Sequence, residues 1–300
     1  MEQADCVELR ERKTAAVEIF RTTPPKTVCP NFYVLAHANG CGFAPRCSYC
    51  YLKSSFPNLQ DNQVFSNVDT LIRECSDWID QDGLESTVLN TGNLSDSLTF
   101  EDARPLMAAL IELFRERAEQ RGRPHSLLVV TKGAGKACRP FFESAPCRNV
   151  VVSFSMNCAA AARDHEPGAP PVEARLEAAA RLKALGWRVR VRVDPIIVGY
   201  AYDAIIGAVR DLKPERLTLG TLRAEANLEK HAPAGLFDAL ELRDDPKGMR
   251  RYAFPVRVAA YRPAVEALRG ICPIGLCEET REMWDALALD TAAKSCNCGG

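Results

Sequence analysis

Three cysteines stand close together near the start of the chain. Cys41, Cys47 and Cys50 lie in "NGCGFAPRCSYCYLKSSF" with the spacing C-x5-C-x2-C, and no histidine or fourth cysteine follows nearby. A closed structural zinc site takes four protein ligands. A cubane iron–sulfur cluster can be held by thiolates at three of its irons, which leaves the fourth iron for a ligand that is not protein. The spacing therefore favours a [4Fe–4S] cluster with one open, reactive position.

A second group of cysteines lies near the end of the chain. Cys272 and Cys277 have the spacing C-x4-C, and Cys296 and Cys298 have the spacing C-x-C. Four thiols suit an auxiliary iron–sulfur cluster, a zinc ion or a soft substrate such as a trivalent metalloid, and they could equally be redox thiols or stay unbound. The C-x2-C knuckles typical of zinc sites are missing. An auxiliary cluster is the first expectation, and the other ligands remain alternatives.

The alternation of short apolar runs with helical patterns predicts how these residues are positioned. We expect strands at 28–36, 85–92, 126–132, 149–157, 188–198 and 216–222. We expect helices at 68–80, 99–122 with Thr99 as N-cap, 171–186 and 202–213. Such alternation predicts an α/β fold with a parallel sheet and right-handed crossovers. Six units fit a partial (β/α)6 barrel of the TIM type, with its chemistry at the carboxyl ends of the strands, where the cysteine loop also lies.

The predicted pattern weakens after residue 222. There we expect a helix at 235–245, an extended segment at 249–256 and a helix at 261–271. The predicted organisation is an N-terminal extension (1–27), the partial barrel (28–222) and a C-terminal region (223–300) that ends in the cysteine-rich extension.

Two of the predicted strands are polar on one face. Ser153, Ser155 and Asn157 alternate with apolar residues, and the next strand places arginines and an aspartate opposite its valines: Arg188, Arg190, Arg192 and Asp194. A strand buried on both faces would be apolar throughout, so this alternation indicates a lined cavity. The arginines could bind an anionic group, pair with other charges of the cavity or belong to an exposed edge strand.

Composition and charge restrict the classes of protein further. The chain has 300 residues, 47% apolar and 26% charged, which is typical of a globular protein. A net charge of −1 provides no field that would attract nucleic acid or anionic lipid. No apolar run reaches the roughly 18 residues of a membrane span, and the N-terminus lacks the apolar segment of a secretory signal. We therefore expect a cytoplasmic protein, in which singly scattered cysteines are small buried hydrophobes: Cys6, Cys29, Cys75, Cys138, Cys147 and Cys158.

Several segments resemble, in order, those of spore photoproduct lyase, a family of the radical S-adenosylmethionine (SAM) superfamily. These are "CSYCYLKS", "NLSDSLTFE", "VVTK", "VVSFSMN" and "HEPGAPPVEARLEAAARLKALGW", and the resemblance extends over about 28–222. It implies that the open iron binds the amino and carboxylate groups of SAM, and that SAM is cleaved reductively, usually to a 5′-deoxyadenosyl radical. The common spacing in the superfamily is C-x3-C-x2-C, so this chain has two extra residues in its loop, where insertions are tolerated.

The resemblance also implies roles for individual residues. Cys41, Cys47 and Cys50 would hold the cluster, and four residues match positions that contact SAM: Tyr51, Ser95, Lys132 and Ser155. Further candidates by their placement are Asp96, Asn157, Arg192 and Asp194. A radical SAM enzyme also needs an external electron donor of the flavodoxin or ferredoxin type.

The departures from the family pattern concern the substrate. Asn93 stands where the lyase has a cysteine that donates a hydrogen atom, and a cysteine-rich tail replaces the segment of the DNA-binding hairpin. We therefore expect radical chemistry on a small, anionic substrate, and we do not expect nucleic acid or membrane partners. The alternatives are transfer of the 3-amino-3-carboxypropyl group of SAM to a thiol- or arsenic-type nucleophile held by the C-terminal cysteines, a DNA photoproduct lyase, and a non-catalytic zinc-binding module.

Overall fold

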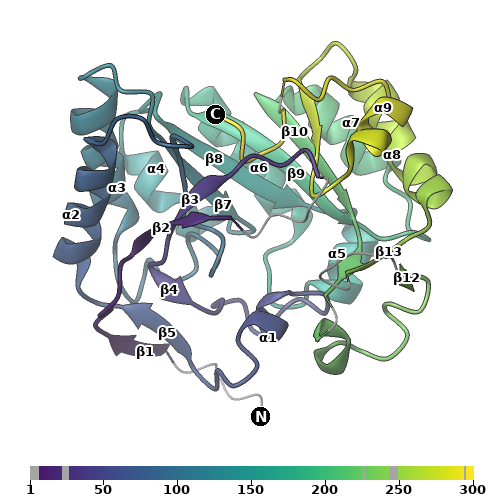
Figure 1. Ribbon diagram of the computed structural model, residues 1–300, viewed down its shortest axis with the longest axis horizontal. Helices are drawn as coiled ribbons and strands as arrows, with labels where there is room; N and C mark the ends of the chain where they lie inside the picture. The colour runs from purple at the N-terminus through teal and green to yellow at the C-terminus, as the bar shows by residue number, and fades with distance from the viewer. Residues whose placement is uncertain (1–6, 22–26, 226, 243–248, 294) are drawn as a thin grey trace.

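A curved sheet of eight strands forms the centre of the molecule (Figure 1). The computed structural model describes residues 7–21, 27–225, 227–242, 249–293 and 295–300. Six strands are parallel and follow one another across the sheet in chain order: β3 (Phe32–Leu35), β6 (Val88–Asn90), β7 (Ser126–Thr131), β8 (Val150–Met156), β9 (Arg188–Ile196) and β10 (Arg216–Thr221). This confirms the six predicted strands and the partial (β/α)6 barrel.

Two strands extend this sheet at its edges. β2 (Val17–Phe20) is antiparallel to β3, and β14 (Ile274–Leu276) is parallel to β10. The sequence did not reveal β14, because a strand of three residues is too short to show a periodic pattern. The predicted C-terminal region thus contributes a strand to the sheet, while the three-part division of the chain remains a prediction.

Helices cover the outer face of the sheet. Those that follow the predicted strands are α2 (Val68–Ile79), α3 (Met107–Phe114), α4 (Arg139–Glu143), α5 (Ala159–His165), α6 (Val172–Ala184) and α7 (Asp203–Leu212). Further along the chain lie α8 (Phe254–Leu268) and α9 (Arg281–Ala286). Val189, Val191 and Val193 of β9 are buried in the main hydrophobic core, so the opposite face of β9 carries its polar residues as predicted. None of the described helices is long and apolar enough to cross a membrane.

Short elements complete the fold around this centre. α1 (Leu52–Ser55) follows the cysteine loop, and a π-helical turn, η1 (Arg115–Glu119), continues α3. Two 3-10 turns are η2 (Gly135–Cys138) and η3 (Leu228–His231). A small sheet joins β1 (Val7–Arg10), β5 (Asn62–Phe65) and β4 (Ala38–Asn39), and another joins β11 (Arg223–Ala224), β13 (Arg250–Arg251) and β12 (Glu241–Leu242).

Two predicted helices differ in the structure. The helix expected at 99–122 begins at Met107, and Thr99 is not its N-cap. Pro105 disfavours helical conformation at the residue before it, and the carboxylate of Glu101 accepts hydrogen bonds from the backbone N–H groups of Leu106 and Met107 at 3.1–3.3 Å. The helix expected at 235–245 is also wrong: the chain forms turns there and enters β12, and residues 243–245 lie outside the described part. The helix expected at 261–271 is present as far as Leu268, as the end of α8. Because α8 already begins at Phe254, the segment expected to be extended at 249–256 is extended only in its first part, around β13.

Candidate active site

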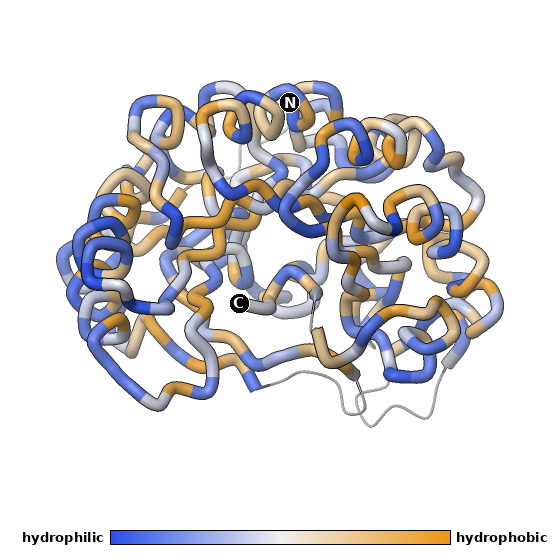
Figure 2. The backbone as a smooth tube through the Cα atoms, turned by 90° about the horizontal axis from the view of Figure 1, so that it is seen from above, coloured by the Kyte–Doolittle hydropathy of each residue, from blue (hydrophilic) through white to orange (hydrophobic). Residues whose placement is uncertain are grey.

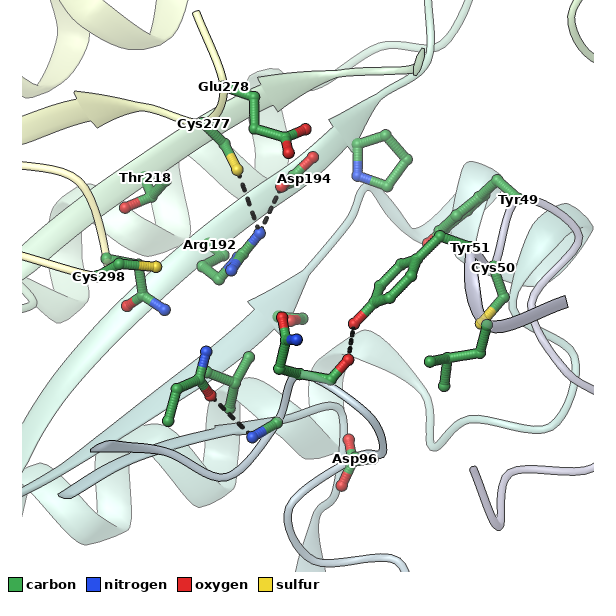
Figure 3. A pocket seen from close by; sticks show the side chains of 18 of the residues that line it. Tyr49, Cys50, Tyr51, Asp96, Arg192, Asp194, Thr218, Cys277, Glu278 and Cys298 are labelled. Atoms are coloured by element: carbon green, nitrogen blue, oxygen red, sulfur yellow. Dashed lines mark hydrogen bonds and ion pairs between the residues drawn. The ribbon is translucent and has the colours of Figure 1, made fainter. Parts of the chain in front are cut away.

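A cavity of about 330 Å³ at the carboxyl ends of the central strands brings together most of the predicted site residues. Its lining includes Cys41, Cys47, Cys50, Tyr51, Ser95, Asp96, Lys132, Ser155, Arg192 and Asp194. Figure 3 shows Tyr51 and Cys50 on one side of this space, with Arg192, Thr218 and Cys298 on the other. The roles of these residues as ligands remain predictions, and the structure establishes that they share one cavity.

The cysteine loop is fixed by the segment that follows α5. The backbone N–H of Ser48 donates to the carbonyl of His165 at 2.9 Å, and the Ser48 hydroxyl lies 2.9 Å from Nδ1 of the same histidine. Gly168 packs so closely on the loop that a Cβ there would lie 2.5 Å from the carbonyl oxygen of Pro45. Only glycine permits this approach. The Glu-Pro-Gly segment therefore determines where the loop sits.

Glu166 and Arg175 form a buried ion pair behind the loop. Arg175 Nη1 lies 2.6 Å from Glu166 Oε2, and both side chains are only 1% exposed. The Tyr49 hydroxyl and Asn157 Nδ2 also donate to Glu166. Burial opposes ionisation, but Lys132 and Arg175 lower the pKa of Glu166 to about 2. Sequence reasoning did not assign this pair a role, although Glu166 belongs to the quoted "HEPG" segment.

Asn157 is not part of the cavity lining. Its Nδ2 donates to Glu166, and its Oδ1 accepts from the Tyr202 hydroxyl at 2.9 Å and from the backbone N–H of Cys158. These contacts occupy the amide on both sides. The structure therefore places Asn157 in the support of the site, and a contact with SAM remains only a prediction.

Asp96 organises the end of β7. Its carboxylate accepts hydrogen bonds from the Thr131 hydroxyl at 2.8 Å and from the backbone N–H groups of Lys132 and Leu98 at 2.7 and 3.0 Å. The Lys132 ammonium lies 5.7 Å from the ring centre of Tyr49 and lines the cavity. Asp96 thereby holds the turn that directs this cation toward the cysteine loop.

The cysteine loop fits the predicted cluster in its donor set. Cys41, Cys47 and Cys50 are free thiols that line the same cavity. Burial raises the pKa of Cys47 to about 11, and the Lys132 ammonium opposes this shift. In the described residues, no three His, Cys, Asp or Glu side chains surround one point as a single metal ion requires. A cubane does not require this, because its three thiolates bind different iron atoms.

The arginines of β9 have different partners along the strand. Arg188 and Arg190 both bind Glu215, at 2.7 and 3.0 Å, so here the alternative of charges that pair with one another is confirmed. Arg192 lies one layer nearer the carboxyl end and donates from Nη2 to Asp194 at 2.5 Å and to Cys277 Sγ at 3.5 Å. Of these three arginines, only Arg192 lines the cavity.

Asp194 is the centre of an ion-pair network: its pair with Arg192 is the alternative of charges that pair with one another, whereas Arg223 and Glu278 were not predicted to take part. Arg223 binds it at 2.8 Å and also pairs with Glu278. Burial acts against ionisation, but Arg223 and Arg192 keep the pKa of Asp194 well below its usual range. A Cβ at Gly220 would lie 2.3 Å from Asp194 Oδ1, so glycine at this position makes room for the carboxylate.

The C-terminal cysteines divide into two sets. Cys277, Cys296 and Cys298 line the cavity, together with Cys29 from the start of the chain, whereas Cys272 is not in the lining. Burial, and after it the neighbouring Cys296, raises the pKa of Cys29 to about 12. The four cysteines that line this part of the cavity thus differ from the predicted group in one residue: Cys29 is present and Cys272 is not. What these thiols bind remains a prediction.

Comparison with known proteins identifies the family. The family model of spore photoproduct lyase matches residues 7–214. The chain belongs to the spore photoproduct lyase family. It is therefore a radical SAM-type enzyme, a class whose cofactors are SAM and a [4Fe–4S] cluster. A comparison with curated protein sequences gave no match.

Solved structures of spore photoproduct lyase share the fold. The lyase complexed with dinucleoside spore photoproduct is 17% identical, with a TM-score of 0.73 over 91% of this chain and 82% of that chain. A double mutant of the lyase with bound AdoMet and dinucleoside spore photoproduct is also 17% identical, with a TM-score of 0.72 over the same shares of the two chains.

Proposed function

We propose that this spore photoproduct lyase family member cleaves SAM reductively and starts radical chemistry on a small substrate inside the cavity. One observation carries the proposal: the three cysteines of the loop and the predicted SAM contacts Ser95, Lys132 and Ser155 line the same cavity. The cluster would be held by Cys41, Cys47 and Cys50, and would supply the electron that breaks a C–S bond of SAM.

The chain's own residues would bind and orient SAM. The Lys132 ammonium offers a charge-assisted hydrogen bond to the SAM carboxylate, and the hydroxyls of Ser95 and Ser155 offer partners for its polar groups. Tyr51 donates its hydroxyl to the carbonyl of Asn93, which fixes the ring at the cavity wall. The electron would come from an external flavodoxin- or ferredoxin-type donor.

A DNA lesion is not the substrate that these residues support. Asn93 offers no thiol for hydrogen-atom return, and the C-terminal tail contributes Cys296, Asn297 and Cys298 to the cavity wall. The expected negative charge of the substrate rests on Arg192, which lines the cavity although it also pairs with Asp194, because Arg188 and Arg190 pair with Glu215 outside the lining.

The experiment is product analysis under exclusion of air. Protein reconstituted with iron and sulfide, then given dithionite and SAM, should release 5′-deoxyadenosine. A C41A/C47A/C50A variant treated in the same way should bind less iron and release none. Reconstituted wild-type protein that releases no SAM fragment would refute the proposal, and a colourless protein with zinc and no iron would indicate a zinc-binding module.

A second candidate function is supported by the thiols in the cavity. Cys277, Cys296 and Cys298 face the space that SAM would occupy in part. A soft nucleophile held there could accept the 3-amino-3-carboxypropyl group of SAM. The nucleoside product would then be 5′-methylthioadenosine, so chromatography distinguishes the two functions.

A further inference from the structure

The C-terminal tail is built into the interior of the molecule. Figure 2 shows the chain ending in the middle of the ring formed by the other elements. Arg190 Nη1 donates to the carbonyl oxygens of Asn297 and Gly299 at 2.6 and 2.9 Å, and Arg216 Nη1 donates to those of Cys296 and Gly299 at 3.0 and 3.1 Å. These charge-assisted bonds hold the backbone of the tail in place.

The tail also depends on a glycine in the sheet. A Cβ at Gly275 of β14 would lie 2.3 Å from the backbone nitrogen and 2.4 Å from the Cα of Cys296. The Ser295 hydroxyl donates to the carbonyl of Ile274 at 2.5 Å. The tail therefore crosses β14 in direct backbone contact, which any larger side chain at position 275 would prevent.

This path places three thiols at one wall of the cavity. Cys296 and Cys298 come from the tail, and Cys29 comes from the other end of the chain. The backbone N–H of Glu278 donates to Cys29 Sγ at 3.3 Å, and the backbone N–H of Val28 donates to the carbonyl of Glu279 at 3.0 Å. The thiols are near enough that Cys296 acts electrostatically on both others. We refer to Cys29, Cys296 and Cys298 as the tail thiol group.

Two polar side chains beside this group have no protein partner. Asn297 and Thr218 line the cavity and are each only 1% exposed. Within the described part of the chain, no hydrogen bond is made by the side-chain amide nitrogen or oxygen of Asn297. The same is true of the Thr218 hydroxyl oxygen. Buried polar atoms of this kind are rare in folded proteins and indicate an absent ligand or water. A ligand that satisfies them needs both donors and acceptors, as hydroxyl groups provide.

We propose that the tail thiol group binds a trivalent metalloid presented as its hydroxide, such as arsenous acid, with Asn297 and Thr218 as hydrogen-bond partners for the hydroxyl groups of the incoming acid and for the water that each exchange releases. Each thiol proton combines with one hydroxide of the metalloid and leaves as water, while a sulfur–metalloid bond replaces the oxygen–metalloid bond. No electron is transferred and no co-reactant is needed. The inference rests on the second candidate function, and the bound metalloid would be the acceptor of the 3-amino-3-carboxypropyl group.

The number of thiols favours this ligand over a closed zinc site, and the iron count in the test below distinguishes it from an auxiliary cluster, which three thiolates can also hold. Cys277, the fourth cysteine on this side, lies against two cations, because Arg192 and Arg223 donate to its sulfur at 3.5 and 3.3 Å, and a zinc ion bound there would face both of them. Cys272, which the sequence offers, is not in the cavity. Three thiols match a trivalent centre, whereas a closed zinc site takes four ligands. The three sulfur atoms do not yet surround one point, so binding would draw them together.

The test measures binding without the cluster or SAM. Full-length C41A/C47A/C50A protein is dialysed anaerobically against arsenite, and bound arsenic is counted. One arsenic per chain is expected. Adding C29S or C298S should weaken binding about 100-fold, because each removes one of three linked bonds. C272S is the matched control and should bind as the parent does.

A further variant keeps every thiol. G275A displaces the tail through its backbone contact, so it should also weaken arsenite binding, and circular dichroism checks that the variants are folded. Unchanged affinity in folded C29S, C298S or G275A would overturn the proposal. So would loss of binding in C272S, or four irons per chain after reconstitution of the C41A/C47A/C50A parent. A negative result in arsenite binding would not affect SAM cleavage, which is measured on the reconstituted wild type. The two experiments therefore distinguish failure of this inference from failure of the proposed function.

Discussion

Replacement of Arg175 by methionine should destabilise the protein strongly. The guanidinium is fully buried, pairs with Glu166 at 2.6 Å and also donates to the carbonyls of Pro170 and Ser155 at 2.8 and 3.1 Å. Methionine keeps much of the apolar volume but removes the direct ion-pair partner of the buried Glu166 carboxylate, which then has only the more distant Lys132 ammonium nearby. Loss of one partner of a buried pair costs about 3–5 kcal/mol of unfolding free energy.

The assay is urea unfolding of the cluster-free protein at neutral pH. The control is R21M, which removes the exposed pair of Arg21 and Glu85 and should cost much less, because solvent screens that pair. The double variant R175M/E166Q should recover part of the loss, because it removes the unpaired charge. If R175M costs no more than R21M, Glu166 does not depend on Arg175 and the account of the buried pair is wrong.

The same variant also tests how the cysteine loop is positioned. Glu166 accepts from the Tyr49 hydroxyl, and Tyr49 lies between two of the loop cysteines. R175M should therefore lower the iron content after reconstitution more than R21M does. Equal iron contents in the two folded variants would show that the loop is held without the ion pair.

Three further predictions concern pH, SAM and the network around Asp194. The pKa of Glu166 in the folded protein is lowered to about 2, so the ionised carboxylate stabilises the fold above pH 4.5, and this stabilisation is lost as the pH falls toward 2. In E166Q, the free energy of unfolding in urea should therefore depend less on pH between 4.5 and 2 than in the wild type. An equal dependence in both proteins would contradict this account. K132M should weaken SAM binding in anaerobic dialysis about 10- to 100-fold through loss of one charge-assisted hydrogen bond, and an equal Kd would refute that contact. G220A should lower the unfolding free energy by about 1–3 kcal/mol because its Cβ meets Asp194, whereas G207A, with no atom near its Cβ, should not; equal effects would count against the clash.

The local pattern of the chain was enough to predict the framework and the first cysteine site. Apolar runs bounded by turn residues identified six strands, because burial of a strand in a parallel sheet leaves a continuous local signature. The loop of Cys41, Cys47 and Cys50 could be recognised because its spacing is itself local. Lys132 was named as a SAM contact because the segment "VVTK" resembles that of the family, and its position at the end of a predicted strand agreed with this.

Pairings between distant segments could not be predicted in this way. Cys29 lies 249 residues before Glu278, whose backbone N–H it accepts, and no periodic pattern links the two. Glu166 and Arg175 were visible as residues, but their burial as a pair depends on how α6 packs against β8. Thr99 offered a plausible N-cap, yet Glu101 caps α3 because Pro105 delays the helix.

The sequence by itself determined the class of sheet, the order of its strands and a loop with three thiols and no fourth ligand. These features follow from residue types at short spacing, where backbone geometry leaves few alternatives. Only the tertiary structure decided which other thiols reach the cavity. Arg190, Arg216 and Gly275 hold the last residues back across β14, so Cys296 and Cys298 line the cavity together with Cys29, while Cys272 is not in the lining.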